Sequence, residues 1–303
     1  QWSLYQCRTC GAAYLDPRPT TETIAMAYSE YYTHEEPANT KHGLLADIKR
    51  RLRNDYLNSR YHTDFSPSSK LGRWITPLLI TKRIQLDERV RHLPATPGTL
   101  VDIGCGNGEY LRTAMDLGWE TWGINLDPKA VETAINTGAT VIHGGFPDTG
   151  LPSQYFDVVT LSHVIEHVHN PIAAMQEVFR ILRPGGQIWI ATPNLDSFGH
   201  RRFGPDWRGL EPPRHLVLFT RKSLNKALFD TGFVNFQNKT CRPQAYEFYK
   251  NSFRIFLSRH QTKTEDFSLT LPLQLEARIA DFIAKFISTG CENLVITAMR
   301  PKL

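Results

Sequence analysis

Apolar and polar residues follow two different rhythms along this chain, and the change comes near residue 95. Between residues 41 and 95 apolar residues recur three or four positions apart, as at Leu44, Ile48 and Leu52, which is the spacing of one helix face. Later in the chain short β-branched runs alternate with helical stretches, and the runs are 99–103, 121–125, 140–143, 156–161, 187–191, 233–241 and 292–298. Strands that alternate with helices at this spacing predict a mostly parallel, doubly wound α/β sheet.

Capping and turn residues predict where helices begin and end. Asp127-Pro128 and Asn170-Pro171 each place a capping side chain before a proline that suits the first turn of a helix. Helices are therefore predicted over 128–136 and 171–182, and Pro184-Gly185-Gly186 is expected to end the second.

The change of pattern divides the chain into three predicted zones. Residues 1–40 are aromatic and turn-rich, and we interpret them as an N-terminal lid with part of a zinc ribbon. Residues 41–95 form a basic helical cap, and residues 96–303 form the α/β core. A chain of 303 residues is long enough for one large domain with such an appendage.

The composition is that of a globular protein. With 41% hydrophobic and 21% charged residues, the chain is neither disordered nor of low complexity. We see no signal-peptide pattern and no apolar run long enough for a membrane span. Five cysteines, an odd number, then fit reduced thiols, and we expect a cytoplasmic protein.

Positive charge is concentrated in one segment. Residues 41–92 hold 12 Lys and Arg against 5 Asp and Glu. We interpret this excess as a solvated helix face; the alternatives are contact with an anionic membrane through residues 44–57, or RNA binding. RNA is disfavoured because the chain carries no RNA-binding motif.

The glycine-rich turn at Gly104-Cys105-Gly106-Asn107-Gly108 follows the first predicted strand of the core. Glycines at such a turn let the backbone approach a ligand across the carboxyl ends of the strands. The spacing G-x-G-x-G differs from the G-x-G-x-x-G of dinucleotide sites, and the turn lacks the G-K-[ST] of nucleoside triphosphate loops. The turn therefore predicts a different ligand.

Together with three other segments, this turn resembles the class I S-adenosylmethionine-dependent methyltransferases. The four segments are VDIGCGNG (101–108), GINLDP (123–128), FDVVTLSHVIEHV (156–168) and LRPGGQIWIATPN (182–194). TPNLDS (192–197) and WRGLEPPRHLVLFT (207–220) resemble bacterial small-molecule methyltransferases, which are distantly similar to quinone-pathway O-methyltransferases. The resemblance implies a Rossmann-like sheet of seven strands with the last one antiparallel, S-adenosylmethionine as cofactor and S-adenosylhomocysteine as product.

The resemblance also assigns cofactor contacts by position. The methionyl end of the cofactor would be held by residues of the first strand and the glycine turn, which are Asp102, Gly104, Cys105 and Gly106. The ribose would be held after the second strand by Asn125 and Leu126, and the adenine after the third strand by Gly145 and Phe146. Ser162 and His163, after the fourth strand, would border the cofactor.

Asn125 departs from the family pattern, which has an acid at this position to bind both ribose hydroxyls. A neutral hydrogen bond contributes about 0.5–1.5 kcal/mol, against about 1.5–3 kcal/mol for a charged one. A degenerate methyltransferase fold that serves as a binding or scaffold protein is therefore an alternative to the enzyme.

Two histidines are candidate bases for an acceptor hydroxyl. His215 is the first choice because its segment follows the fifth strand, and His167 is the second. Trp207 and Arg214 are candidates to line the acceptor pocket, with Arg214 suited to a carboxylate or phosphate. The expected acceptor is a small molecule, a sugar or a lipid-linked group, methylated at oxygen.

We expect no metal in this chain. His163 and His167 have the i, i+4 spacing that can bind zinc, but a cofactor contact or a structural role is the preferred interpretation. Cys7-x-x-Cys10 is half of a zinc ribbon, and a closed site needs four ligands. The aromatics Tyr28, Tyr31 and Tyr32 resemble a lid, although they could equally be packing residues.

Overall fold

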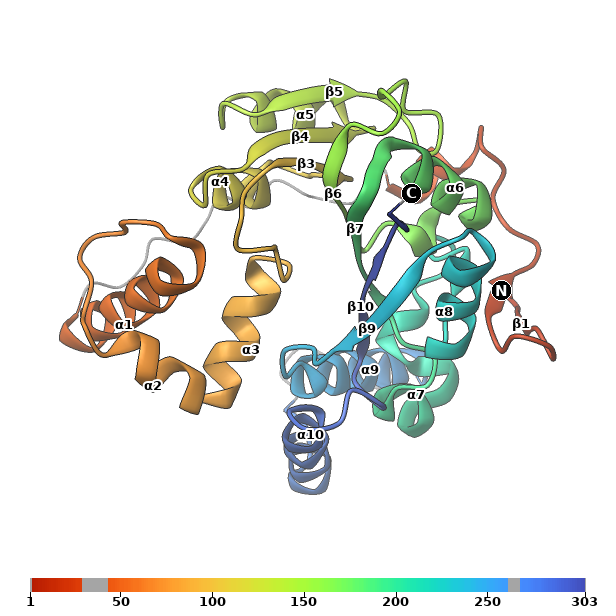
Figure 1. Ribbon diagram of the computed structural model, residues 1–303. Coiled ribbons are helices and arrows are strands. Elements are labelled where there is room, and N and C mark those ends of the chain that lie inside the picture. Colours follow the sequence, from red (N-terminus) through yellow and green to blue (C-terminus); the bar gives the residue numbers. More distant parts are fainter. Residues whose placement is uncertain (1, 29–42, 261–267, 303) are drawn as a thin grey trace. The chain divides into compact units, whose positions relative to one another are not determined.

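The computed structural model describes residues 2–28, 43–260 and 268–302 (Figure 1). Its backbone contacts form two compact units. We call Gln1–Tyr31, Phe146–Gln154 and Leu161–Leu303 the first unit, and Tyr32–Gly145 with Tyr155–Thr160 the second. The division into 1–40, 41–95 and 96–303 remains a prediction.

The strands and helices of the described residues are as follows. The strands are β1 (Leu4–Gln6), β2 (Ala13–Leu15), β3 (Thr99–Ile103), β4 (Glu120–Asn125), β5 (Thr140–His143), β6 (Phe156–Ser162), β7 (Leu182–Pro193), β8 (Val217–Leu218), β9 (Val234–Lys239) and β10 (Asn293–Met299). The α-helices are α1 (Leu44–Tyr61), α2 (Gly72–Leu78), α3 (Ile80–Arg89), α4 (Glu109–Met115), α5 (Pro128–Ile135), α6 (Pro171–Ile181), α7 (Phe198–Phe203), α8 (Arg221–Asp230), α9 (Ala245–Arg259) and α10 (Leu271–Ala284). Short 3₁₀ turns are η1 (Ile24–Tyr28), η2 (Ile165–His167), η3 (Gly204–Asp206) and η4 (Arg208–Leu210).

Seven strands form the main sheet in the order β5-β4-β3-β6-β7-β10-β9. β3, β4 and β5 pair in parallel, whereas β10 runs antiparallel to both β7 and β9. The predicted Rossmann-like sheet with an antiparallel last strand is confirmed. A second, antiparallel sheet has the order β1-β2-β8.

The predicted helix starts are confirmed, but one predicted helix end is wrong. Asp127 accepts a hydrogen bond from the Lys129 amide at 2.9 Å and caps α5, and Asn170 caps α6 through the Ala173 amide at 3.1 Å. The prolyl-glycine run 184–186 does not end α6, because α6 already stops at Ile181 and the run lies inside β7. The Gly185 amide donates to the Arg300 carbonyl, so this run continues the antiparallel pairing with the end of the chain.

Within the second unit, α1 and α2 pack at very short range. An added Cβ on Gly72 would lie 2.1 Å from the Leu52 carbonyl oxygen, so only glycine fits where α2 begins. Asp55 accepts from the Arg73 amide at 2.8 Å and pairs with the Arg73 guanidinium. No described helix is long and apolar enough to cross a bilayer.

Candidate functional site

The glycine turn lies in the second unit, at the carboxyl end of β3. Gly104, Gly106 and Gly108 all have positive φ angles, of 72°, 54° and 81°. The Gly104 amide donates to the Ile124 carbonyl at 2.8 Å, which holds the turn beside the end of β4. A Cβ added to Gly106 would meet no atom within 4 Å, so the backbone here borders open space that a ligand can fill.

Asp102 lies beneath this turn and is fully buried. One carboxylate oxygen accepts hydrogen bonds from Arg91 and from the Thr160 hydroxyl, the latter at 2.8 Å. The other oxygen has no hydrogen-bond partner among the described residues. Burial raises the pKa of Asp102, and the guanidinium of Arg91 opposes that shift. An unpartnered carboxylate oxygen beneath an open glycine turn suits a ligand with an ammonium group.

Cys105 lies in the same turn, and its side chain is buried against Gly123 of β4. The residue is 6% exposed, and a Cβ on Gly123 would come within 2.8 Å of its Sγ. Burial raises the pKa of Cys105 to about 12, so the residue is a neutral thiol. Any cofactor contact by Cys105 would therefore use its backbone.

Asn125, Leu126 and Gly145 lie together at the ends of β4 and β5. Asn125 Oδ1 accepts from the Asp127 amide at 2.9 Å, and the Asn125 carbonyl accepts from Gly144. The Leu126 side chain is 71% exposed, and a Cβ on Gly145 would lie 3.6 Å from its Cδ2. An amide beside an exposed apolar side chain suits a ribose with a flat ring attached.

The remaining predicted residues fall in the first unit, where His163 contacts a buried carboxylate. Phe146 and Ser162 are partly buried, and Ser162 ends β6. His163, with φ of 55°, directs Nδ1 to 3.2 Å from a carboxylate oxygen of Glu166. Glu166 is fully buried and also accepts from the Thr192 hydroxyl at 2.9 Å. Burial opposes its ionisation, but the His163 hydrogen bond and the neighbouring histidines lower the pKa of Glu166 to about 2.

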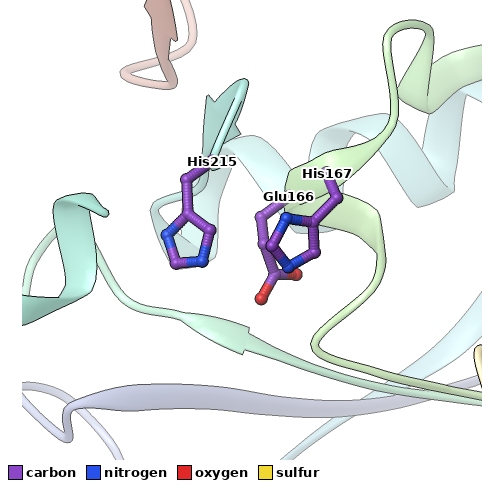
Figure 2. A group of neighbouring side chains, drawn as sticks. All are labelled: Glu166, His167 and His215. Atoms are coloured by element: carbon purple, nitrogen blue, oxygen red, sulfur yellow. The ribbon is translucent and has the colours of Figure 1, made fainter. Parts of the chain in front are cut away.

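His167 and His215 lie beside this carboxylate (Figure 2). Their ring centroids are 4.8 Å apart, and His167 belongs to the 3₁₀ turn η2 and not to a helix shared with His163. His167 Nδ1 lies 3.0 Å from the Arg214 carbonyl oxygen and 2.9 Å from the Tyr28 hydroxyl. A carbonyl only accepts, so Nδ1 carries the proton and Nε2 is the basic atom.

His215 is 5% exposed, and its Nδ1 donates to the Gly209 carbonyl at 2.7 Å. Burial lowers the pKa of His215 to about 4, so the ring is neutral at pH 7. The buried ring thus resists taking up a proton, which weakens its case as a general base.

Glu166, His167 and His215 each offer one ligand atom, and these atoms lie within 4.8 Å of one another. Within the described residues they are the one group of three or more metal-ligating side chains so placed. Two histidines and a carboxylate are a donor set for Zn²⁺ or Fe²⁺. This grouping is not predictable from the sequence, because His215 is remote from the other two residues in the chain.

Trp207 and Arg214 each contact an acidic side chain of the same unit. Trp207 is 1% exposed and donates its indole N–H to Glu292 at 2.8 Å, so the described conformation keeps it in the core. Arg214 is ion-paired with Glu211. An open groove of about 650 Å³ lies nearby in the same unit, bordered by Leu210 of the loop that carries His215. Its other lining residues are Trp2, Leu4, Gln6, Ala13, Leu195, Asp196, His200, Arg201, Gly204, Pro205 and Pro212.

Cys7 and Cys10 lie in the β1–β2 hairpin with free thiols. Amide hydrogen bonds from Cys10 and Thr9 lower the pKa of Cys7 to about 7. The pair supplies two ligands, and no third joins them among the described residues. Of the three lid aromatics, Tyr28 contacts His167, while Tyr31 and Tyr32 lie outside the described residues.

Arg91, Glu166 and Glu211 were missed as candidate residues. Glu166 stands within SHVIEH, and its position between two histidines was the available signal. Arg91 has no sequence signal, because it reaches Asp102 only through the left-handed backbone at Arg91 and His92.

Comparisons with known proteins agree with these motifs. A family model described as a methyltransferase domain matches residues 80–238, just over half of the chain. A probable S-adenosylmethionine-dependent methyltransferase of Mycolicibacterium smegmatis is 32% identical over 108 residues, 35% of this chain and 42% of that protein. A ubiquinone biosynthesis O-methyltransferase of Paraburkholderia xenovorans is 30% identical over 125 residues, 39% of this chain and 54% of that protein.

The chain spans about half the length of the curated relatives it matches. Among solved structures, an S-adenosylmethionine-dependent methyltransferase from Archaeoglobus fulgidus is 16% identical, with a TM-score of 0.49 over 80% of this chain and 97% of that one. The family match, the motif order and the order of the seven strands agree, and the chain belongs to the methyltransferase-domain family.

Proposed function

We propose that this chain is an enzyme that transfers a methyl group from S-adenosylmethionine to an acceptor oxygen, releasing S-adenosylhomocysteine. The acceptor class is a small molecule, a sugar or a lipid-linked group, and the site of action is the cytoplasm. Family membership supports methyl transfer, and the O-methyltransferase names of several relatives favour oxygen.

The observation that carries the proposal is the open glycine turn above Asp102. The space over Gly106 and the unpartnered oxygen of Asp102 fit the methionyl end of the cofactor, whose ammonium group would meet the carboxylate. Asn125 would bond the ribose, and Leu126 and Gly145 would contact the adenine, with Phe146, Ser162 and His163 as further cofactor contacts.

The cofactor supplies an electrophilic methyl group, and the protein must align the acceptor and remove its proton. Of the two candidate bases, His167 is favoured because burial holds the pKa of His215 near 4. We assign His215 and Glu166 to fixing the orientation of the His167 ring. We assign the open groove bordered by Leu210 and His200 to the acceptor. Trp207 would support this groove from the core through its ring contact with His200, and Arg214 would act only on an acceptor that displaces Glu211.

Calorimetric titration with S-adenosylmethionine and S-adenosylhomocysteine, with NAD as a control, tests the cofactor. We expect micromolar binding of the first two and none of NAD. Gly106→Ala should abolish binding, since its Cβ fills the ligand space while meeting no protein atom. Gly150→Ala is the matched control: Gly150 also has positive φ (66°) and open space, so it suffers similar backbone strain, and it is not among the proposed cofactor contacts.

Two rivals predict other outcomes. A scaffold protein on a degenerate fold would bind neither ligand, or would bind them equally well in Gly106→Ala. An RNA methyltransferase would bind RNA with an affinity that falls steeply with salt. Either result would replace the proposed function.

A further inference from the structure

We propose that α1 and α2 form a docking surface for an anionic lipid membrane. The surface consists of exposed apolar residues of the two helices and the basic residues around them. This inference does not depend on methyl transfer, because every residue in it lies outside the proposed cofactor and acceptor sites.

The apolar part of the surface is exposed on both helices. On α1, Leu44 and Leu45 are 79% and 72% exposed, and Ile48 follows one turn later. On α2, Trp74 and Leu78 are 71% and 79% exposed. Side chains of this size are normally buried, and several together mark an interaction site.

The two helices that carry these side chains are neighbours, because α2 begins against α1 (Figure 1). The Ser69 amide donates to the Arg51 carbonyl at 3.2 Å, and Gly72 lies against the Leu52 carbonyl. Leu71, which is 60% exposed, lies between these two contacts. The start of α2 therefore crosses α1 one turn after Ile48.

Charge identifies the partner. Residues 44–83 carry nine Lys and Arg against three Asp, and two of these Asp, Asp47 and Asp55, already pair with arginines of the same helices. Lys49 and Lys70 are exposed beside the apolar residues. Apolar side chains with a Trp, ringed by cations, suit the boundary between headgroups and acyl chains of an anionic bilayer.

A second exposed apolar face, on α10, lacks this charge. Leu271, Leu275, Ile279 and Phe282 are at least half exposed. Residues 271–286, however, carry two acidic and two basic residues, which gives an anionic surface no electrostatic attraction. α10 is therefore an internal control for apolar exposure alone.

Co-sedimentation of the full chain with vesicles tests the proposal. We expect binding to phosphatidylcholine vesicles that contain about 30% phosphatidylglycerol, weakening with salt, and at least about tenfold weaker binding to pure phosphatidylcholine. Lys49→Glu with Lys70→Glu, and separately Trp74→Ser with Leu78→Ser, should each reduce binding at least about tenfold. All four side chains are exposed, so folding should persist, and circular dichroism checks this.

Two control variants distinguish binding through this surface from nonspecific adsorption of the protein to vesicles. Lys222→Glu with Lys302→Glu changes two exposed lysines elsewhere, and Leu275→Ser with Phe282→Ser changes the α10 face; neither should weaken vesicle binding. Tryptophan emission should shift to the blue on binding. Trp74→Phe should keep the binding and lose most of that shift.

Three outcomes would overturn the proposal. One is no binding to the anionic vesicles at low salt, and another is binding that the α1–α2 variants leave unchanged. The third is a lipid-free dimer that Trp74→Ser with Leu78→Ser converts to monomers, because that surface would then be an interface between two copies. Cofactor titration of the same variants should be unchanged, so failure here is distinguishable from failure of the methyltransferase proposal.

Discussion

Asn125 sets how tightly a ribose can be held after β4. Its Oδ1 already accepts the Asp127 amide, so the side chain is fixed in place without carrying charge. A carboxylate at the same position would keep that amide bond and offer a charged acceptor to the ribose hydroxyls. The neutral residue therefore lowers the affinity for a ribose but leaves the geometry of the ribose site intact.

Asn125→Asp is expected to tighten S-adenosylhomocysteine binding about fivefold, which corresponds to about 1 kcal/mol, the margin of a charged over a neutral hydrogen bond. Calorimetry on the two proteins at pH 7.5 measures it. Asp127→Asn is the matched control, because Asp127 caps α5 and should leave the affinity within about twofold. Weaker binding by Asn125→Asp would mean that the ribose does not lie there.

Substitution of His167 should lower turnover more than substitution of His215. With an acceptor in hand, His167→Asn is expected to lower kcat about 100-fold or more, the usual contribution of a positioned base. His215→Asn keeps a donor for the Gly209 carbonyl and should cost less. A larger loss in His215→Asn, at unchanged cofactor affinity, would return the role of base to His215.

At the scale of elements, the contact of α1 with α2 depends on one glycine. Gly72→Ala would push a methyl group into the Leu52 carbonyl, and backbone atoms cannot yield as a flexible side chain would. Overpacking of this kind costs about 1–3 kcal/mol. Urea unfolding should show that loss, whereas Gly43→Ala, at the start of α1 with open space around it, should be nearly neutral.

The strands of the core were predictable because each is a short β-branched run bounded by turn residues. α5 and α6 were predictable from Asp127-Pro128 and Asn170-Pro171, whose capping bonds are local. Gly185 misled the prediction because its role depends on Arg300, over a hundred residues away. The same limit applies to the site: the glycine turn is local, but the meeting of Glu166, His167 and His215 requires the tertiary fold.

For the whole molecule, two buried groups give opposite pH dependences of stability. His215 has its pKa lowered to about 4 by burial, so the unfolded chain binds more protons, and stability falls as pH drops from about 6.5 to 4. Glu292, 3% exposed, has its pKa raised to about 7 by burial, against the hydrogen bonds from Trp207 and Gly199. Its contribution is lost as pH rises from about 4.5 to 7.

Between pH 4.5 and 6.5 these two slopes cancel in the native protein, and single variants should separate them. In Glu292→Gln, unfolding free energy should rise by about 3 kcal/mol more than in the native protein between pH 4.5 and 7, because the opposing term is gone. In His215→Asn it should fall with rising pH over the same range by a similar amount.

Urea titrations of the three proteins at several pH values measure these differences, and subtracting the profiles removes the titrating groups that interact with neither residue. Glu166 interacts with His215, but its pKa of about 2 lies below this pH range. The double variant should return to the profile of the native protein, since the two residues share no hydrogen bond in the described structure. Parallel profiles in all three proteins would show that folding does not shift the pKa of either side chain. The buried histidine would then be a stronger candidate base than its burial suggests.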